Sequence, residues 1–159
     1  MKILTFLHSF EPGGVERVAL RLAACWQKQG LEAPVFMGRL DGAGRIAEAE
    51  RLRLIYPATP PISPAWIETM WMIATLPGVI RREKPDALFC AGNSYSVVAV
   101  AMKLLLGAEC PPIVAKISND LDRRDIVRPA RWLYHLWLRI QSPFLDHIVA
   151  MEASMKPEI

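Results

Sequence analysis

Two adjacent glycines, Gly13 and Gly14, stand where an apolar run changes into a helical pattern, and they are well suited to ligand binding. Residues 2–8 are rich in strand formers, and Glu11-Pro12-Gly13-Gly14 interrupts that run. Glycines at a strand-to-helix turn let backbone N–H groups approach a ligand closely, and the helix N-terminus adds about half a positive charge. The turn therefore predicts a site for a phosphate or a carbohydrate hydroxyl, or else a tight turn without a ligand.

The segment after the glycines has the period of an amphipathic helix that ends at Gly30. Its apolar positions are Val15, Val18, Ala19, Leu22, Ala23 and Trp26. Glu16 and Arg17 fall in the first turn, where they either orient a ligand or form a solvated face in which Glu16 complements the helix dipole.

Polar residues follow two later strands. Asn93 and Ser94 come after the strand at 85–91, and Asn119 and Asp120 come after the strand at 112–117. Each pair offers hydrogen-bonding groups to a sugar. The alternatives are a helix N-cap for Ser94 and a simple turn for the second pair. Phe10 and Glu11, just before the glycines, are predicted to line the same cleft as these residues.

Strand and helix patterns alternate along the whole chain. Strands are predicted at 2–8, 33–38, 52–57, 85–91, 112–117 and 146–151. The pattern predicts a single α/β domain, a doubly wound, mostly parallel Rossmann-like sheet in the order 3-2-1-4-5-6. Ligands then bind at the carboxyl ends of the strands, beside the reversal between the first and fourth strands. We expect Pro77-Gly78 to kink or interrupt one helix, and the apolar helix at 95–106 to be buried.

Composition limits the classes of function. The 159 residues are 52% hydrophobic and 22% charged, with a net charge of +3, which is too small to indicate nucleic-acid binding by itself. The three cysteines have no metal spacing, and Cys25 and Cys90 lie in apolar segments, so we expect buried thiols in a reducing compartment. We found neither a convincing signal peptide nor a membrane span, and we expect a soluble, cytoplasmic protein.

Several chemistries are disfavoured. The dinucleotide pattern G-x-G-x-x-G is absent, and Met37-Gly38-Arg39 stands where an acidic residue would hold a ribose. The Gly-Lys-Ser/Thr of a P-loop is also missing. His8 ends the first strand and belongs either to the cleft or to the core, and no histidines have metal spacing. No bound cofactor, metal or catalytic residue is therefore predicted.

A basic, tryptophan-containing stretch lies between the last two strands. Its arginines are Arg123, Arg124, Arg128, Arg131 and Arg139. The first four are candidates to face an anionic membrane, because arginine and tryptophan suit a lipid interface. The alternative, which we favour, is a sheet-covering helix whose core-facing side chains are Trp132, Leu133, Leu136, Trp137 and Ile140.

Residues 7–23, Leu-His-Ser-Phe-Glu-Pro-Gly-Gly-Val-Glu-Arg-Val-Ala-Leu-Arg-Leu-Ala, resemble the opening of the retaining GT-B glycosyltransferases of family 4. Pro85-Asp86-Ala87-Leu88-Phe89 resembles the family's Pro-Asp-hydrophobic strand, and Lys116-Ile117-Ser118-Asn119 its basic-x-Ser-Asn strand end. Asp146-His147-Ile148-Val149-Ala150 resembles its last N-domain strand. Where many members have a histidine after the fourth or fifth strand, this chain has Asn93 and Asn119-Asp120.

The resemblance implies a two-domain enzyme that moves a sugar from a nucleotide-sugar donor to an acceptor with retention of configuration. Residues 1–159 would be its N-terminal, acceptor-side domain, inactive without the nucleotide-binding domain and its Glu-x7-Glu motif. Gly13 and Gly14 would face the donor's diphosphate, supported by Glu16 and Arg17. The acceptor would be lipid-linked or a cell-envelope polysaccharide, with the enzyme peripheral on the inner face of the plasma membrane. The alternatives are a standalone Rossmann-like binding module or one subunit of a split transferase.

Overall fold

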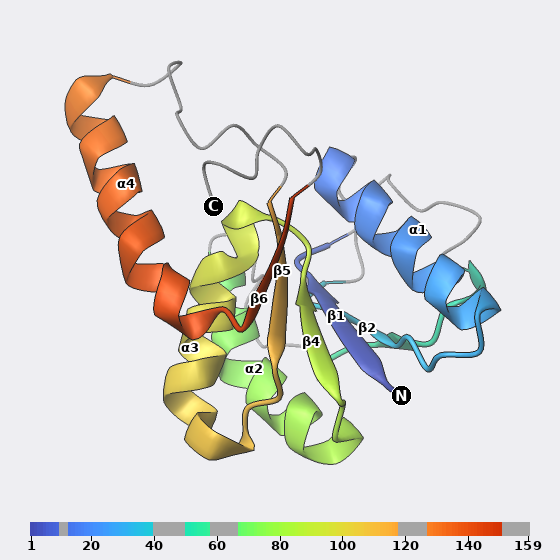
Figure 1. The fold of residues 1–159 in the computed structure, drawn as a ribbon. Helices are drawn as coiled ribbons and strands as arrows, with labels where there is room; N and C mark the ends of the chain where they lie inside the picture. The colour runs from blue at the N-terminus through green and yellow to red at the C-terminus, as the bar shows by residue number, and fades with distance from the viewer. Residues whose placement is uncertain (10–12, 40–49, 58–66, 118–126, 151–159) are drawn as a thin grey trace.

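A six-stranded parallel sheet forms the centre of the computed structural model, which describes residues 1–9, 13–39, 50–57, 67–117 and 127–150 (Figure 1). The strand order is β3-β2-β1-β4-β5-β6, and every pairing is parallel. The predicted fold class and strand order are therefore confirmed. The strands are β1 (Ile3–Leu7), β2 (Val35–Met37), β3 (Leu54–Ile55), β4 (Ala87–Cys90), β5 (Ile113–Ile117) and β6 (His147–Ala150).

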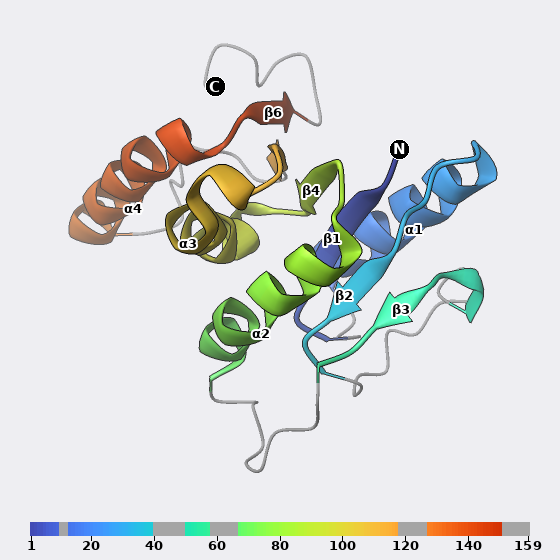
Figure 2. The same cartoon turned by 90° about the horizontal axis from the view of Figure 1, so that it is seen from below.

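Helices cover both faces of this sheet. Figure 2 shows α1 (Gly14–Lys28) on one face and three helices on the other, namely α2 (Glu68–Glu83), α3 (Ser96–Leu106) and α4 (Arg128–Gln141). Short 3-10 turns are η3 (Asn93–Tyr95), η4 (Gly107–Glu109) and η5 (Ser142–Phe144). The chain reverses its winding direction between β1 and β4, as right-handed crossovers in this strand order require.

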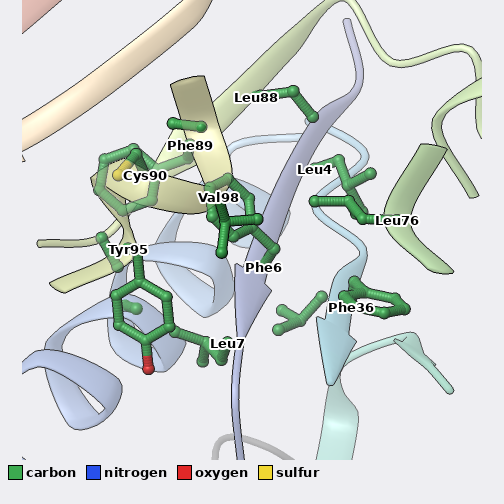
Figure 3. Close-up of a cluster of buried hydrophobic side chains, with 14 of the residues drawn as sticks. Leu4, Phe6, Leu7, Phe36, Leu76, Leu88, Phe89, Cys90, Tyr95 and Val98 are labelled. Carbon is green, nitrogen blue, oxygen red and sulfur yellow. The ribbon is translucent and has the colours of Figure 1, made fainter. Parts of the chain in front are cut away.

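The core is densest around β1 and β4, the two central strands. Leu4, Phe6 and Leu88 are fully buried there, and Figure 3 shows them grouped with Leu76 of α2. On the opposite face, the Trp26 ring of α1 meets the Phe89 ring edge-on, with ring centroids 5.0 Å apart. Strands buried on both faces explain why the sequence shows apolar runs rather than alternation.

The α1 helix follows its predicted pattern. Ala19 and Ala23 are buried at predicted inward positions, and the helix stops before Gly30, whose φ of +84° is easily adopted only by glycine. The prediction that Cys25 is buried is wrong, because Cys25 is exposed. It lies on the polar side of α1, although its neighbours in the sequence are apolar.

Two predictions about the other helices are also wrong in part. Pro77 lies inside one uninterrupted α2, because the packing of Leu76, Val79 and Ile80 offsets the one backbone hydrogen bond that proline removes. α3 is not buried all round, since three of its apolar side chains are exposed: Val97, Leu104 and Leu105.

The prediction that the apolar side of α4 faces the core is wrong. Four of the five side chains predicted to face the core are exposed instead: Trp132 (65%), Leu133 (59%), Leu136 (39%) and Ile140 (48%). Trp137 alone is turned partly inward, where its Nε1 donates to the Ser96 hydroxyl at 3.3 Å. The side of α4 that faces the protein is instead more polar, with Tyr134 half-buried and Gln141 buried.

The amino edge of the sheet is held by a buried carboxylate. Glu83, at the end of α2, accepts a hydrogen bond from Arg53 Nη2 at 3.0 Å and forms an ion pair with Arg53 Nη1 at 2.9 Å, and Lys2 Nζ lies 3.8 Å away. Burial alone would raise the pKa of Glu83, but Arg53 and the neighbouring Arg82 and Lys2 outweigh it and hold that pKa below its ordinary value. This network joins the chain start, the residue before β3 and α2 at the amino edge, opposite the edge where sheets of this type bind ligands.

We predict that Glu83→Gln lowers the free energy of unfolding at pH 7 by about 1–3 kcal/mol, because it removes a charged acceptor from a buried network. Since the folded-state pKa of Glu83 is lowered, its contribution is present above the ordinary pKa and is lost as pH falls through the folded value. Urea unfolding at pH 7 and pH 3 measures both effects. Glu109→Gln, which breaks only the exposed pair with Arg81, is the matched control and should change stability by less than about 0.5 kcal/mol.

Candidate functional site

The turn from β1 into α1 leaves the N-terminus of α1 open at the carboxyl edge of the sheet. Gly13 is in the N-cap position with extended backbone, and no side chain within the described ranges caps the helix. Gly14 is exposed, and a β-carbon built on it would meet no atom within 4 Å. Among the described residues, no side-chain acceptor caps the N–H groups of the first turn, and a helix dipole favours an anion beside such groups.

Glu16 is turned back toward its own helix start. Its Oε1 accepts a 2.6 Å hydrogen bond from the Tyr95 hydroxyl, and a β-carbon on Gly13 would overlap its carboxylate. A larger residue at position 13 would therefore push the Glu16 carboxylate out of this placement. The Glu16 carboxylate covers Gly13 and leaves Gly14 open.

Tyr95 supplies the hydrogen bond from a buried position on the other side of the reversal point. Its ring is 1% exposed, meets the Phe6 ring edge-on and stacks on the His8 imidazole at 4.7 Å between centroids. Figure 3 shows the ring among the apolar core side chains with its hydroxyl at the margin of the cluster. Burial, together with the nearby Glu16 carboxylate, raises the pKa of Tyr95 far above its ordinary value, so the phenol remains a donor.

A second polar contact lies beside this one. Arg39, which follows β2, pairs with Glu68 at the start of α2 at 2.8 Å, and both side chains are largely buried. The Arg39 backbone N–H also donates to the His8 carbonyl at 2.8 Å. The ends of β1 and β2 and the start of α2 are thereby held together next to the Glu16–Tyr95 contact.

On the α4 side, hydrogen bonds join Asn93 to two helices. Its Nδ2 donates to the Tyr134 hydroxyl at 3.0 Å, and its backbone carbonyl accepts from the Ser96 hydroxyl at 2.7 Å. Asn93 therefore lies where α4 meets the start of α3. It also lines a cavity of ≈ 620 Å³ between α4 and the carboxyl ends of β4 and β5.

The structure brings some of the predicted site residues together and separates others. Gly13, Gly14 and Glu16 gather at the reversal point, whereas Arg17 is exposed on α1. Ser94 is exposed and caps no helix, because α3 begins after Tyr95 and has no side-chain cap. Six predicted residues lie outside the described residues: Phe10, Glu11, Asn119, Asp120, Arg123 and Arg124. The side chain of Arg128 is likewise not described, and Arg131 is half-buried on α4.

Sequence reasoning missed Tyr95, and it did not find the Arg39–Glu68 pair. Each contact joins segments far apart in the sequence, and nothing in the local pattern marks the partner. Arg39 was noted only because it stands where a ribose-binding acid would be. Its charge at a buried strand end was the available signal that an acidic partner must lie nearby.

The described residues show neither a metal cluster nor an activated Cys90. Burial raises the pKa of the Cys90 thiol to about 12, so it is a poor nucleophile, and all three cysteines are free. No group of three metal-ligating side chains occurs among residues that the structure describes. The candidate site is therefore the start of α1 together with the Glu16–Tyr95 and Arg39–Glu68 contacts beside it.

Comparison with known proteins identifies the family. The model of glycosyltransferase family 4 matches residues 12–159. The chain belongs to glycosyltransferase family 4. No curated protein sequence matches it.

Solved structures with the same fold include glycosyltransferases. The lipopolysaccharide outer core galactosyltransferase WaaB is 13% identical, with a TM-score of 0.66 over 99% of this chain and 41% of its own. MurG of Acinetobacter baumannii is 13% identical, with a TM-score of 0.57, and the match covers 94% of this chain and 41% of MurG. Anabaena Alr3699/HepE, in complex with UDP and glucose, is 18% identical, with a TM-score of 0.57, and the match covers 91% of this chain and 35% of HepE. The chain thus spans about two fifths of the length of these proteins.

We predict that Tyr95→Phe lowers the free energy of unfolding by about 1–2 kcal/mol, because it removes the donor to Glu16 and keeps the ring in place. Chemical denaturation measures the change. Tyr56→Phe, at a half-buried tyrosine beside the core, is the matched control and should change stability by less than about 0.5 kcal/mol. Equal effects of the two substitutions would contradict a stabilising role for the Tyr95–Glu16 hydrogen bond.

Proposed function

We propose that this chain is the N-terminal, acceptor-side half of a retaining glycosyltransferase. It acts on a nucleotide-sugar donor together with a nucleotide-binding half that completes the active site, and residues 1–159 alone do not catalyse transfer. Membership of family 4 and the fold shared with glycosyltransferases such as WaaB support this proposal. The UDP and glucose in the HepE complex illustrate the class of donor proposed for this chain.

The observation that carries the proposal is the start of α1, which no described side chain caps, beside the reversal between β1 and β4. Gly13 and Gly14 present backbone N–H groups there, and the donor's diphosphate is the anion proposed to meet them. Glu16 is fixed by Tyr95, so its carboxylate stays on the side of Gly13 and leaves space at Gly14. Arg17, exposed on the same turn, adds positive charge for the donor.

The acceptor is proposed to lie on the other side of the reversal point. Asn93 is well placed for it, because its amide lies at the carboxyl end of β4 and beside α4. Further residues proposed for the acceptor cleft are Phe10, Glu11, Ser94, Asn119 and Asp120. A lipid-linked sugar or a cell-envelope polysaccharide is the proposed acceptor class.

We predict that Gly14→Asp in the complete enzyme lowers kcat/KM for sugar transfer at least a hundredfold. It places a carboxylate where the diphosphate must bind, and the open space around Gly14 lets the variant fold. Transfer of radiolabelled sugar measures the rate, and circular dichroism measures the fold. Gly14→Ala adds volume without charge and should lose far less activity. Normal turnover by the folded Gly14→Asp enzyme would contradict the placement of the donor.

A second proposal concerns a membrane surface, and it comes from α4. This helix has four exposed apolar side chains along one side, contains Arg128, Arg131 and Arg139, and has no acidic residue. An apolar stripe flanked by cations complements an anionic bilayer surface, where tryptophan rings lie at headgroup depth. In the described part of the chain, no helix has the length and apolarity to cross a membrane. We propose peripheral binding at the inner face of the plasma membrane, with Arg123 and Arg124 contributing charge.

We predict that the protein co-sediments with vesicles containing anionic phospholipid and that Trp132→Ser together with Leu136→Ser reduces the bound fraction at least fivefold. The two side chains contribute apolar burial in the bilayer interface. Met70→Ser on α2 is the matched control, since Met70 is equally exposed at 65% but lies on another helix. An equal reduction of the bound fraction by Met70→Ser, or no vesicle binding of the wild type at low salt, would contradict membrane binding through α4.

A further inference from the structure

The cavity between α4 and the carboxyl ends of β4 and β5 has the dimensions of a small-molecule site. Its volume of ≈ 620 Å³ falls within the usual range for such pockets. Two hydrogen bonds hold α4 beside it, one from Asn93 to Tyr134 and one from Trp137 to Ser96. In Figure 1, α4 stands to one side of the sheet, next to α3. The walls of the cavity are therefore elements that the fold keeps in place.

The side chain of Gln141 points to a ligand in this cavity. Gln141 lines the cavity and is 6% exposed, and its Oε1 is buried without a hydrogen-bond partner among the residues that the structure describes. Leaving a buried acceptor unpaired is costly, so such atoms are uncommon unless a ligand or a water completes them. A ligand hydroxyl is the donor that this oxygen lacks.

A second amide borders the same cavity. Asn93 donates through its Nδ2 to the Tyr134 hydroxyl, and its side-chain oxygen accepts no hydrogen bond among the described contacts. The cavity thus offers two amide oxygens, from Asn93 and Gln141, to hydrogen-bond donors. Hydroxyl groups donate such bonds, whereas an ionised carboxylate presents only acceptors.

The basic residues of the lining do not define the ligand. Lys116 and His135 each take part in an interaction within the protein, and Arg139 is exposed. Their charges therefore give no reason to place an anion in the cavity. The acceptor oxygens are the groups that a ligand would complete, and they favour an uncharged, hydroxyl-bearing molecule.

Most of the remaining lining is apolar. It comes from β5, α4, the residue after η5 and β6, and it includes Ala115, Ile117, Leu138, Leu145 and Ile148. A free sugar gains little from such a surface, whereas a hydrocarbon chain gains free energy by leaving water. The cavity therefore combines acceptors for a hydroxylated head with a surface for a hydrocarbon chain.

We infer that this cavity binds an uncharged glycolipid, with hydroxyls of the sugar head donating to Gln141 and Asn93 and the start of the hydrocarbon chain against Leu138. The inference rests on the proposed function in one respect, because it makes a neutral glycolipid the acceptor. The exposed apolar side of the same helix is the surface proposed to bind a bilayer, and a bilayer would supply such a molecule.

The test is isothermal titration calorimetry of this chain with n-octyl glucoside below its micelle concentration. Glucose, which has the head alone, and n-octyl phosphate, which has the same chain with an anionic head, are the comparison ligands. We expect saturable one-to-one binding of octyl glucoside, at least tenfold tighter than either. No saturable binding of octyl glucoside, or equal affinity for glucose or for octyl phosphate, would overturn the inference.

Gln141→Leu separates a binding role from a structural one. Replacing the unpaired acceptor with an apolar side chain should weaken octyl glucoside binding about tenfold and raise the melting temperature by about 2–4 °C. A substitution that merely damaged the fold would lower both, so a lower melting temperature would contradict the ligand role. Leu138→Trp, which fills part of the cavity with a larger apolar side chain, should also weaken binding at least tenfold.

Leu133→Ser is the matched control, because Leu133 is on the exposed side of α4 and does not line the cavity. It should bind octyl glucoside as the wild type does. A loss equal to that of Gln141→Leu would place the ligand on the exposed side of the helix and overturn the inference. None of these results depends on sugar transfer. Failure here would leave transfer to a different acceptor standing, and failure of transfer would leave the binding site standing.

Discussion

The hydrogen bond from Tyr95 to Glu16 joins the two halves of the winding at their reversal point. Tyr95 follows β4 and Glu16 follows β1, so the contact bridges the two strands between which the crevice of a doubly wound sheet lies. This hydrogen bond fixes the position of the Glu16 carboxylate at the candidate site. Because the buried phenol holds the Glu16 carboxylate over Gly13, the neighbouring Gly14 and the first N–H groups of α1 are left open. The proposed anion site at the helix start depends on this arrangement.

The two edges of the sheet have different roles. At the amino edge, the buried Glu83 forms ion pairs with Arg53, Arg82 and Lys2, so its charge is compensated where the strands begin. At the carboxyl edge lie the start of α1, which no described side chain caps, and a cavity whose basic lining residues are Lys116, His135 and Arg139. α4 borders the second edge and turns its polar side toward the cavity.

The sequence permitted prediction of the sheet order and of α1, because both depend on local periodicity and on the rules of parallel crossovers. The orientation of α4 was not accessible in the same way. Periodicity correctly grouped Trp132, Leu133, Leu136 and Ile140 on one side of the helix, but it does not say whether that side meets the core or the solvent. The Tyr95–Glu16 and Arg39–Glu68 contacts were missed because each depends on tertiary placement of residues from separate elements. Cys25 was misjudged because apolar neighbours in the sequence do not fix the rotation of one helical position.

The central claim is that this family 4 chain serves sugar transfer from a nucleotide donor. The most direct measurement is made on the native protein, isolated from its cells through this domain with every chain that accompanies it. It is incubated with radiolabelled nucleotide sugars and a lipid and polysaccharide extract of the same cells. The account predicts that label from one donor enters an acceptor with its anomeric configuration retained. A folded native protein that transfers no sugar from any donor, while still binding a ligand, would contradict the account and identify the chain as a binding module.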